Sequence, residues 1–76
     1  MNNQRRTIIR RICRDLRSLQ SEVGNLVSAE ETAFDNSPES IQDGDKGEAM
    51  QEAISNLEDA SSSIDEVIDS LEEALA

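Results

Sequence analysis

The chain has 76 residues, 17 of them acidic and seven basic, and it contains no histidine, a single cysteine and a single aromatic residue. The missing histidine removes the general base of serine and cysteine nucleophilic enzymes and disfavours zinc and haem sites, and one cysteine cannot close an intrachain disulfide. We therefore predict a protein that is not an enzyme, that holds no metal or cofactor, and that has a thin aliphatic core.

The N-terminal segment is basic, but no apolar stretch follows that would form a signal peptide or a membrane-spanning helix. Arginines interrupt every apolar stretch of the first 17 residues. We expect a cytoplasmic protein with a reduced Cys13 and no membrane association.

Apolar residues predict a long helix over residues 4–35, because they recur at alternating intervals of three and four, as in helices packed in a coiled coil. Gly24 costs about 1 kcal/mol relative to alanine in a helix interior, and it is a candidate for close approach of another backbone. Cys13 is interpreted as a half-buried small apolar residue. The expected contact stripe is Ile9, Ile12, Leu16, Leu19, Val23, Leu26, Glu30 and Ala33, widened by Ile8, Cys13, Val27 and Phe34.

Six arginines and no lysine fall within residues 5–17. A guanidinium group suits phosphate and carboxylate, because it is planar and donates several hydrogen bonds. One hypothesis is that these arginines bind a small anionic ligand, and the other is that they pair with acids of a neighbouring antiparallel helix. The candidate ligand-binding residues are Arg6, Arg10, Arg14 and Arg17, expected in one stripe on the solvent side of the helix, with Arg5 and Arg11 flanking them. The alternative ion-pair partners are Asp59, Asp65, Glu66, Asp69, Glu72 and Glu73.

Residues 36–44 are predicted to form an elbow between two helices, because they contain the only proline and a cluster of turn-forming residues. We expect Asn36 to end the first helix in a left-handed conformation. Ser37 is expected to cap the following turn, with Pro38 at its first helical position. Ile41 then anchors this turn on the core.

The second predicted helix covers residues 45–75, and Asp45 with Glu48 predicts a capping box at its start. Together with Asp43, these acids lack the spacing of a calcium loop. The heptad seam is Met50, Ile54, Leu57, Ser61, Ile64, Ile68, Leu71 and Leu75, beside a column of Ala53, Ala60, Val67 and Ala74. The outward columns are acidic: Glu52, Asp59, Glu66 and Glu73 in one, Glu58, Asp65 and Glu72 in the next. These acids are interpreted either as a solvated face or as a mimic of nucleic-acid phosphates.

Charge divides the chain sharply, since residues 1–27 carry six arginines against two acids and residues 28–76 carry one lysine against fifteen acids. The acidic part would repel nucleic-acid phosphates, and no Tyr or Trp is present to stack bases, so direct nucleic-acid binding is disfavoured.

The predicted fold is all-α: a single domain, residues 1–76, that forms an antiparallel αα-hairpin and assembles into a homo-oligomeric helical bundle, most simply a dimer. Oligomerisation is expected because a lone hairpin leaves a second apolar column on each helix uncovered. The alternative is a monomer whose helices pair loosely. The uncovered residues are expected to be Ala53, Ala60, Val67 and Ala74 on one helix and Cys13, Val27 and Phe34 on the other.

Phe34–Glu39 follow an aromatic-Asp-Asn-x-Pro-Glu pattern, and Asn56–Ala60 read Asn-Leu-Glu-Asp-Ala. With Gly47–Met50, these residues resemble a group of small acidic helical-hairpin proteins common in bacteriophages and prophages. The resemblance covers residues 30–75 and does not include the arginine-rich start. It implies an accessory protein of a phage, located in the cytoplasm of the bacterial host.

An arginine stripe on a homo-oligomer is similar in its logic to phage anti-defence sponge proteins, which enclose a nucleotide-derived immune signal. We therefore expect a non-enzymatic protein that sequesters a small anionic, nucleotide-derived ligand through the arginines. One misfit is that Phe34 is the only aromatic residue available to stack on a base. Two alternatives remain: an acidic protein that blocks a basic surface of a host nucleic-acid-binding protein, and a purely structural coiled-coil module.

Overall fold

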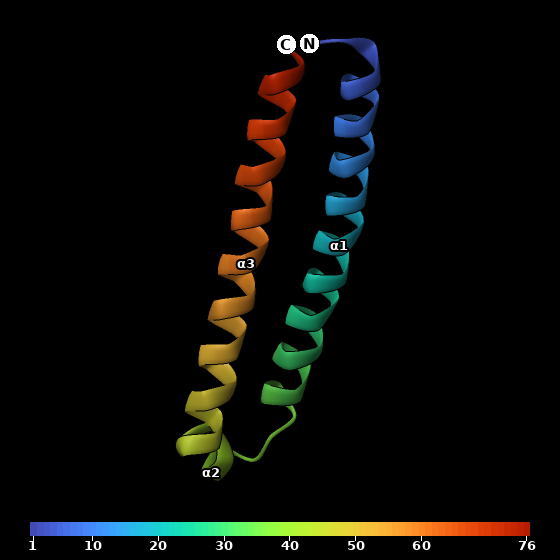
Figure 1. Cartoon of the computed structure of the whole chain (residues 1–76). Helices are drawn as coiled ribbons and strands as arrows, with labels where there is room; N and C mark the ends of the chain where they lie inside the picture. Colours follow the sequence, from blue (N-terminus) through green and yellow to red (C-terminus); the bar gives the residue numbers. More distant parts are fainter.

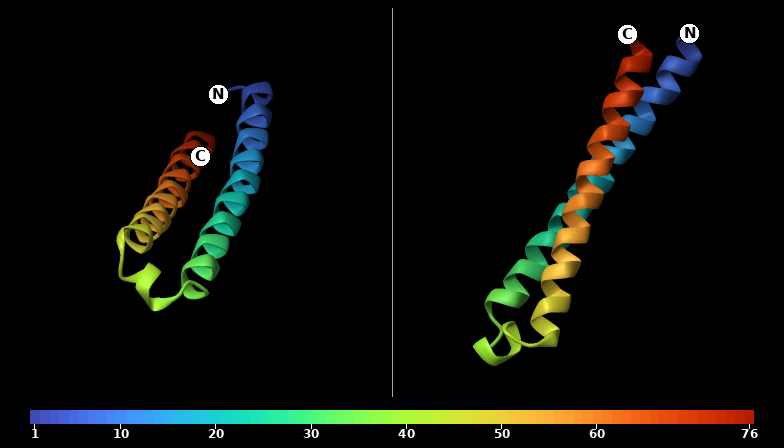
Figure 2. Two further views of the ribbon diagram at one scale, coloured as in Figure 1. Left: turned by 90° about the horizontal axis from the view of Figure 1, so that it is seen from below. Right: turned by 90° about the vertical axis from the view of Figure 1, so that its left-hand side faces the viewer.

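The computed structural model describes all 76 residues and contains helices and short connections only. Two long antiparallel helices, α1 (Asn3–Asp35) and α3 (Asp45–Leu75), are joined through the single-turn helix α2 (Glu39–Gln42) (Figure 1). The molecule is a rod of 58 × 15 × 12 Å, with both chain ends at one end and α2 at the other (Figure 2). The predicted helical hairpin is confirmed. Neither long helix has a stretch apolar enough to cross a membrane.

Local hydrogen bonds cap both ends of α1. The cap at its C-terminal end differs from the one that the sequence predicted. Asn2 caps the start, because its side-chain oxygen accepts from the Arg5 amide at 2.9 Å. At the other end Asn36 stays right-handed, with φ of −86°, and its amide donates to the Thr32 carbonyl at 3.0 Å. The Ser37 hydroxyl donates to the Ala33 carbonyl at 2.8 Å. The expectation of a left-handed Asn36 was wrong, since these bonds already satisfy the last carbonyls of α1.

The start of α3 also differs from the expectation of a capping box. Gly44 occupies the N-cap position without a side-chain hydrogen bond, so Asp45 lies inside the first turn and cannot cap it. Asp45 and Glu48 still favour this helix end, because negative charge is stabilised near a helix N-terminus. Pro38 similarly precedes α2 as its N-cap residue instead of occupying the first helical position.

Helix α2 is held close to both long helices. The Gln42 side-chain amide donates to the Phe34 carbonyl at 2.8 Å, and Ile41 is half-buried. Gly47 is buried where α3 passes α2, and a Cβ atom built on it would overlap the Gln42 carbonyl group. Gly24 has no such neighbour, since nothing lies within 4 Å of a Cβ built there. The close approach expected at Gly24 is therefore absent from the hairpin and occurs at Gly47 instead.

The contact between α1 and α3 follows the predicted seam completely on α3 and only in part on α1. Every predicted seam residue of α3 is buried or half-buried. On α1 the helix is rotated, so Leu19, Leu26 and Ala33 are exposed and the next residue along the chain faces α3 in each case. The covered residues of α1 between positions 9 and 34 are Ile9, Ile12, Cys13, Leu16, Gln20, Val23, Val27, Glu30 and Phe34.

The rotation of α1 is possible because two heptad tracks overlap on this helix and share Ile9, Leu16, Val23 and Glu30. The observed track covers Phe34, the only aromatic residue, and brings Gln20 onto α3. The Gln20 amide donates to the Ser61 carbonyl at 2.9 Å and to an Asp65 carboxylate oxygen at 2.7 Å. A polar side chain that keeps its hydrogen bonds can occupy such a seam without a large desolvation cost.

Candidate binding surfaces

The six arginines lie on the first half of α1, at the end of the rod where the chain termini meet. Arg6 is half-buried and does not face solvent as expected, because its guanidinium donates to the Leu75 carbonyl of α3 and to the Met1 carbonyl. The last carbonyls of a helix lack partners within it and carry partial negative charge. Arg6 therefore acts as a cap for the C-terminus of α3.

Two further arginines have carboxylate partners within the chain. Arg17 pairs with Glu72 across the two helices, and Arg11 pairs with Asp15 one turn along α1 at 3.1 Å. All four side chains are about half exposed, so each pair contributes about 0–1 kcal/mol. The hypothesis of pairing within the hairpin thus describes Arg17, while Arg11 pairs within its own helix.

The remaining arginines, Arg5, Arg10 and Arg14, are exposed and have no carboxylate within ion-pair distance. A helical turn takes 3.6 residues, so Arg10, Arg14 and Arg17, which are three, four or seven positions apart, share one side of α1. Arg5 is five positions from Arg10 and lies on a different side. The fold therefore does not gather the six arginines into one cluster.

The acidic side chains of α3 form the largest charged surface. All residues of its two outward acidic columns are exposed, and only Glu72 among them is in an ion pair. In the whole chain, Asp15 and Glu72 are the only carboxylates so paired, out of 17. The columns are Glu52, Asp59, Glu66 and Glu73, and Glu58, Asp65 and Glu72.

Charge is uneven along the rod. At the end with the termini, residues 1–17 and 65–76 carry six arginines against six acids, so this end is neutral. At the elbow end, residues 30–52 carry eight acids against one lysine, a net charge of −7. The basic N-terminal segment therefore does not give a basic end, because the hairpin lays the acidic end of α3 beside it.

The two sides of the hairpin that flank the seam differ in chemistry. One side, which we term the polar flank, contains Arg10, Arg17, Gly24 and Glu31 of α1 and Gln51, Glu58, Asp65 and Glu72 of α3. The opposite side, which we term the apolar flank, contains Ile12, Leu19, Leu26 and Ala33 of α1 and Ala53, Ala60, Val67 and Ala74 of α3.

The sequence prediction of the uncovered apolar column agrees with the structure on α3, where Ala60, Val67 and Ala74 are exposed, and is wrong on α1. Cys13, Val27 and Phe34 were expected to stay uncovered, yet Cys13 is only 2% exposed and the other two face α3. Leu19 and Leu26, expected in the seam, are the uncovered residues. The signal that could have identified them is shared by both helices: uncharged residues repeat every seven positions over four heptads.

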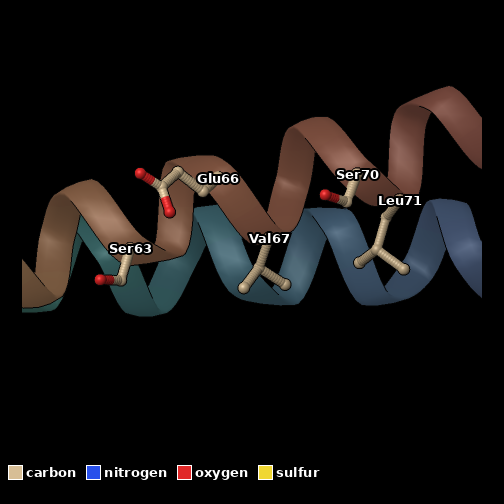
Figure 3. Close-up of a pocket in the computed structure, with 5 residues that line it drawn as sticks. All are labelled: Ser63, Glu66, Val67, Ser70 and Leu71. Atoms are coloured by element: carbon tan, nitrogen blue, oxygen red, sulfur yellow. The ribbon is translucent and has the colours of Figure 1, made fainter.

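The surface also contains one open hollow, beside Val67 on α3. All of its lining comes from α3, and the Val67 and Leu71 side chains point to the same side in Figure 3. The lining residues are Ser63, Glu66, Val67, Ser70 and Leu71. No group of three or more His, Cys, Asp or Glu side chains lies close enough together to hold a metal ion.

Fold and surfaces together define an acidic helical hairpin with one apolar and one polar flank. Comparisons of the chain with models of protein families, with curated proteins and with solved structures give no match. The resemblance to phage hairpin proteins therefore stays a prediction.

Proposed function

We propose that the chain is a non-enzymatic interaction protein whose acidic helix α3 occupies a basic surface on a partner protein. The observation that carries this proposal is the pair of outward acidic columns on α3, exposed along the helix and almost free of counterions from the chain itself. A basic groove that otherwise accepts nucleic-acid phosphates has the complementary chemistry.

The geometry of α3 supports this role because the carboxylates sit at regular intervals on a rigid element. Residues seven positions apart in a helix are separated by about 10.5 Å, so Glu52, Asp59 and Glu66 form an evenly spaced row. The net charge of −10 also attracts a basic partner over long range and raises the association rate at low salt.

The test is charge reversal of the row, in the triple variant Glu52→Lys, Asp59→Lys and Glu66→Lys. Proteins captured from bacterial lysate by the wild-type chain are expected to elute with salt and with added DNA. The triple variant is expected to lose this capture.

The matched control changes the same amount of charge on α1, at the exposed residues Glu22, Glu31 and Asp35. It should retain most of the capture. Equal loss in both variants would show that net charge alone is responsible, and unchanged capture by the α3 variant would refute the proposed role of the row.

A second candidate function, sequestration of a small anionic, nucleotide-derived ligand, is favoured by one observation. Arg10 and Arg14 are exposed and unpaired in a chain with 17 acids. The resemblance to phage proteins would make such a ligand a host immune signal. This candidate ranks second because Arg6 and Arg17 are engaged by α3 and because the arginine-bearing end has no net positive charge.

Native mass spectrometry of protein purified from unchallenged and phage-challenged cells tests the second candidate. An adduct of a few hundred daltons that disappears in Arg10→Glu or Arg14→Glu supports it. Lys46→Glu, at the start of α3 and therefore at the elbow end of the rod, is the control of equal charge change. An adduct that persists in both arginine variants, or no adduct in wild type, removes the proposed ligand site.

In either role we propose that the working unit is a homo-oligomer in the cytoplasm of a bacterial host. The location follows from the resemblance to phage proteins. The large apolar side chains that the single hairpin leaves exposed support the oligomer.

A further inference from the structure

We propose that the apolar flank is the surface on which a second copy of this chain docks, each copy using the same flank, so that two hairpins form a four-helix bundle. This inference rests on the homo-oligomer of the proposed function and names its interface. The partner is a second copy because a two-fold axis can pair a surface with itself.

The two halves of the apolar flank lie on the same side of the hairpin. In an antiparallel helix pair, the heptad column on one side of the seam faces the corresponding column of the other helix. Arg17 and Glu72 belong to such corresponding columns and are in contact, which identifies the polar flank. The columns of Leu19 on α1 and Val67 on α3 must then share the other side, where they form one continuous surface.

The exposure of this surface is costly in an isolated hairpin. Leu19 is 53% exposed, Leu26 54% and Val67 49%, while Gln20 and Cys13 occupy the seam. A different rotation of α1 would place both leucines in the seam, as the sequence first suggested. The fold instead satisfies Gln20 internally and turns the leucines outward, and a second apolar surface would restore their burial.

The hairpin exposes more surface than a compact protein of the same mass, enough to supply a standard interface. The hairpin exposes 5489 Å² and has a mass of 8.4 kDa. A compact monomer of that mass exposes about 4,600 Å², and the excess of about 900 Å² is close to the ~800 Å² per partner that a standard interface buries. The radius of gyration, 17.3 Å, likewise exceeds the ~11 Å of a compact domain of this length.

The charge pattern permits self-association despite the net charge of −10. None of the eight residues of the apolar flank is charged, although charged residues make up 32% of the chain. Interface centres are depleted of charge in this way. Ser63 and Ser70 border the flank on α3, and the hollow beside Val67 offers space for a side chain of the second copy.

Sedimentation equilibrium of the purified chain over a range of concentrations tests the proposal directly. Wild type is expected to be a dimer, and the double variant Leu19→Glu, Leu26→Glu is expected to raise the dissociation constant about a hundredfold or more, because charge replaces buried leucine in both copies. The control is Ser18→Glu, Asn25→Glu, which adds the same charge at exposed positions one residue away and should leave the dimer intact.

A second variant keeps the test valid if the double variant does not fold as a monomer. Val67→Gln changes the same surface from α3 without adding charge, and it should weaken association while circular dichroism shows unchanged helix content. A monomeric wild type, or a dimer that survives both sets of changes, overturns the proposal. These measurements contain only the purified chain, so they test the dimer interface and not the binding of a partner protein to the acidic helix. The triple variant Glu52→Lys, Asp59→Lys and Glu66→Lys should still dimerise.

Discussion

At the scale of single residues, the two glycines within the long helices have opposite roles. Gly47 lies against the backbone of Gln42, so an added Cβ must displace α2. Gly24 has open space around it. Glycine is otherwise unfavourable in a helix by about 0.5–1 kcal/mol relative to alanine. The same substitution should therefore change stability in opposite directions at the two sites.

We predict that Gly47→Ala destabilises the hairpin by about 1–3 kcal/mol, the usual range for overpacking, and that Gly24→Ala stabilises it by about 0.5–1 kcal/mol. Urea unfolding followed by circular dichroism measures both. Gly24→Ala also serves as the control for helix propensity. Destabilisation by Gly24→Ala would contradict the prediction and would indicate that another backbone approaches the polar flank.

At the scale of elements, the residues show why α3 could be predicted more fully than α1. On α3 a second uncharged track runs through the column of Ala53 and Val67, but three of its four residues are alanines, whereas the observed seam has Ile54, Ile68 and Leu75 at the corresponding places. On α1, tracks through Leu19 and through Gln20 are both possible, and the choice depends on contacts of Gln20 that only the partner helix supplies. Apolar spacing alone favoured Leu19, which is why that prediction failed.

The arginines were unpredictable in detail for a related reason. Sequence spacing placed Arg6 and Arg10 on one stripe of the helix. Whether the C-terminus of α3 lies beside Arg6 depends on the length of the elbow, which sets how the two long helices align. Ion pairing of Arg17 with Glu72 was among the expected alternatives. The capping role of Arg6 was not, because it uses a backbone carbonyl and no acidic side chain.

The capping role of Arg6 gives a prediction at this scale. Arg6→Ala removes the donor to the Leu75 carbonyl and should destabilise the protein by about 0.5–1.5 kcal/mol, with fraying of the last turn of α3. Arg5→Ala is the control, since Arg5 is exposed and has no such partner. Amide hydrogen exchange at the end of α3 should accelerate in the first variant only. Equal exchange in both variants would show that the cap has no effect.

At the scale of the whole molecule, we expect repulsion between like charges to oppose folding more than the ion pairs support it. The chain has a net charge of −10 and two exposed ion pairs, and the elbow end concentrates a net charge of −7 within 23 residues. Dimerisation would double this charge in one particle. Added salt screens repulsion and attraction alike, so its effect on stability shows which of them dominates.

We predict that raising the salt concentration from about 10 mM to about 150 mM, which shortens the Debye length from about 30 to about 8 Å, raises the melting temperature by several degrees. A stabilisation of about 1 kcal/mol corresponds to about 4–8 °C in a domain of this size. Thermal unfolding at fixed protein concentration measures the shift, with Leu19→Glu, Leu26→Glu as a second sample to separate folding from dimerisation. A fall in the melting temperature would mean that the pairs of Arg17 and Arg11 outweigh the repulsion, which their exposure argues against.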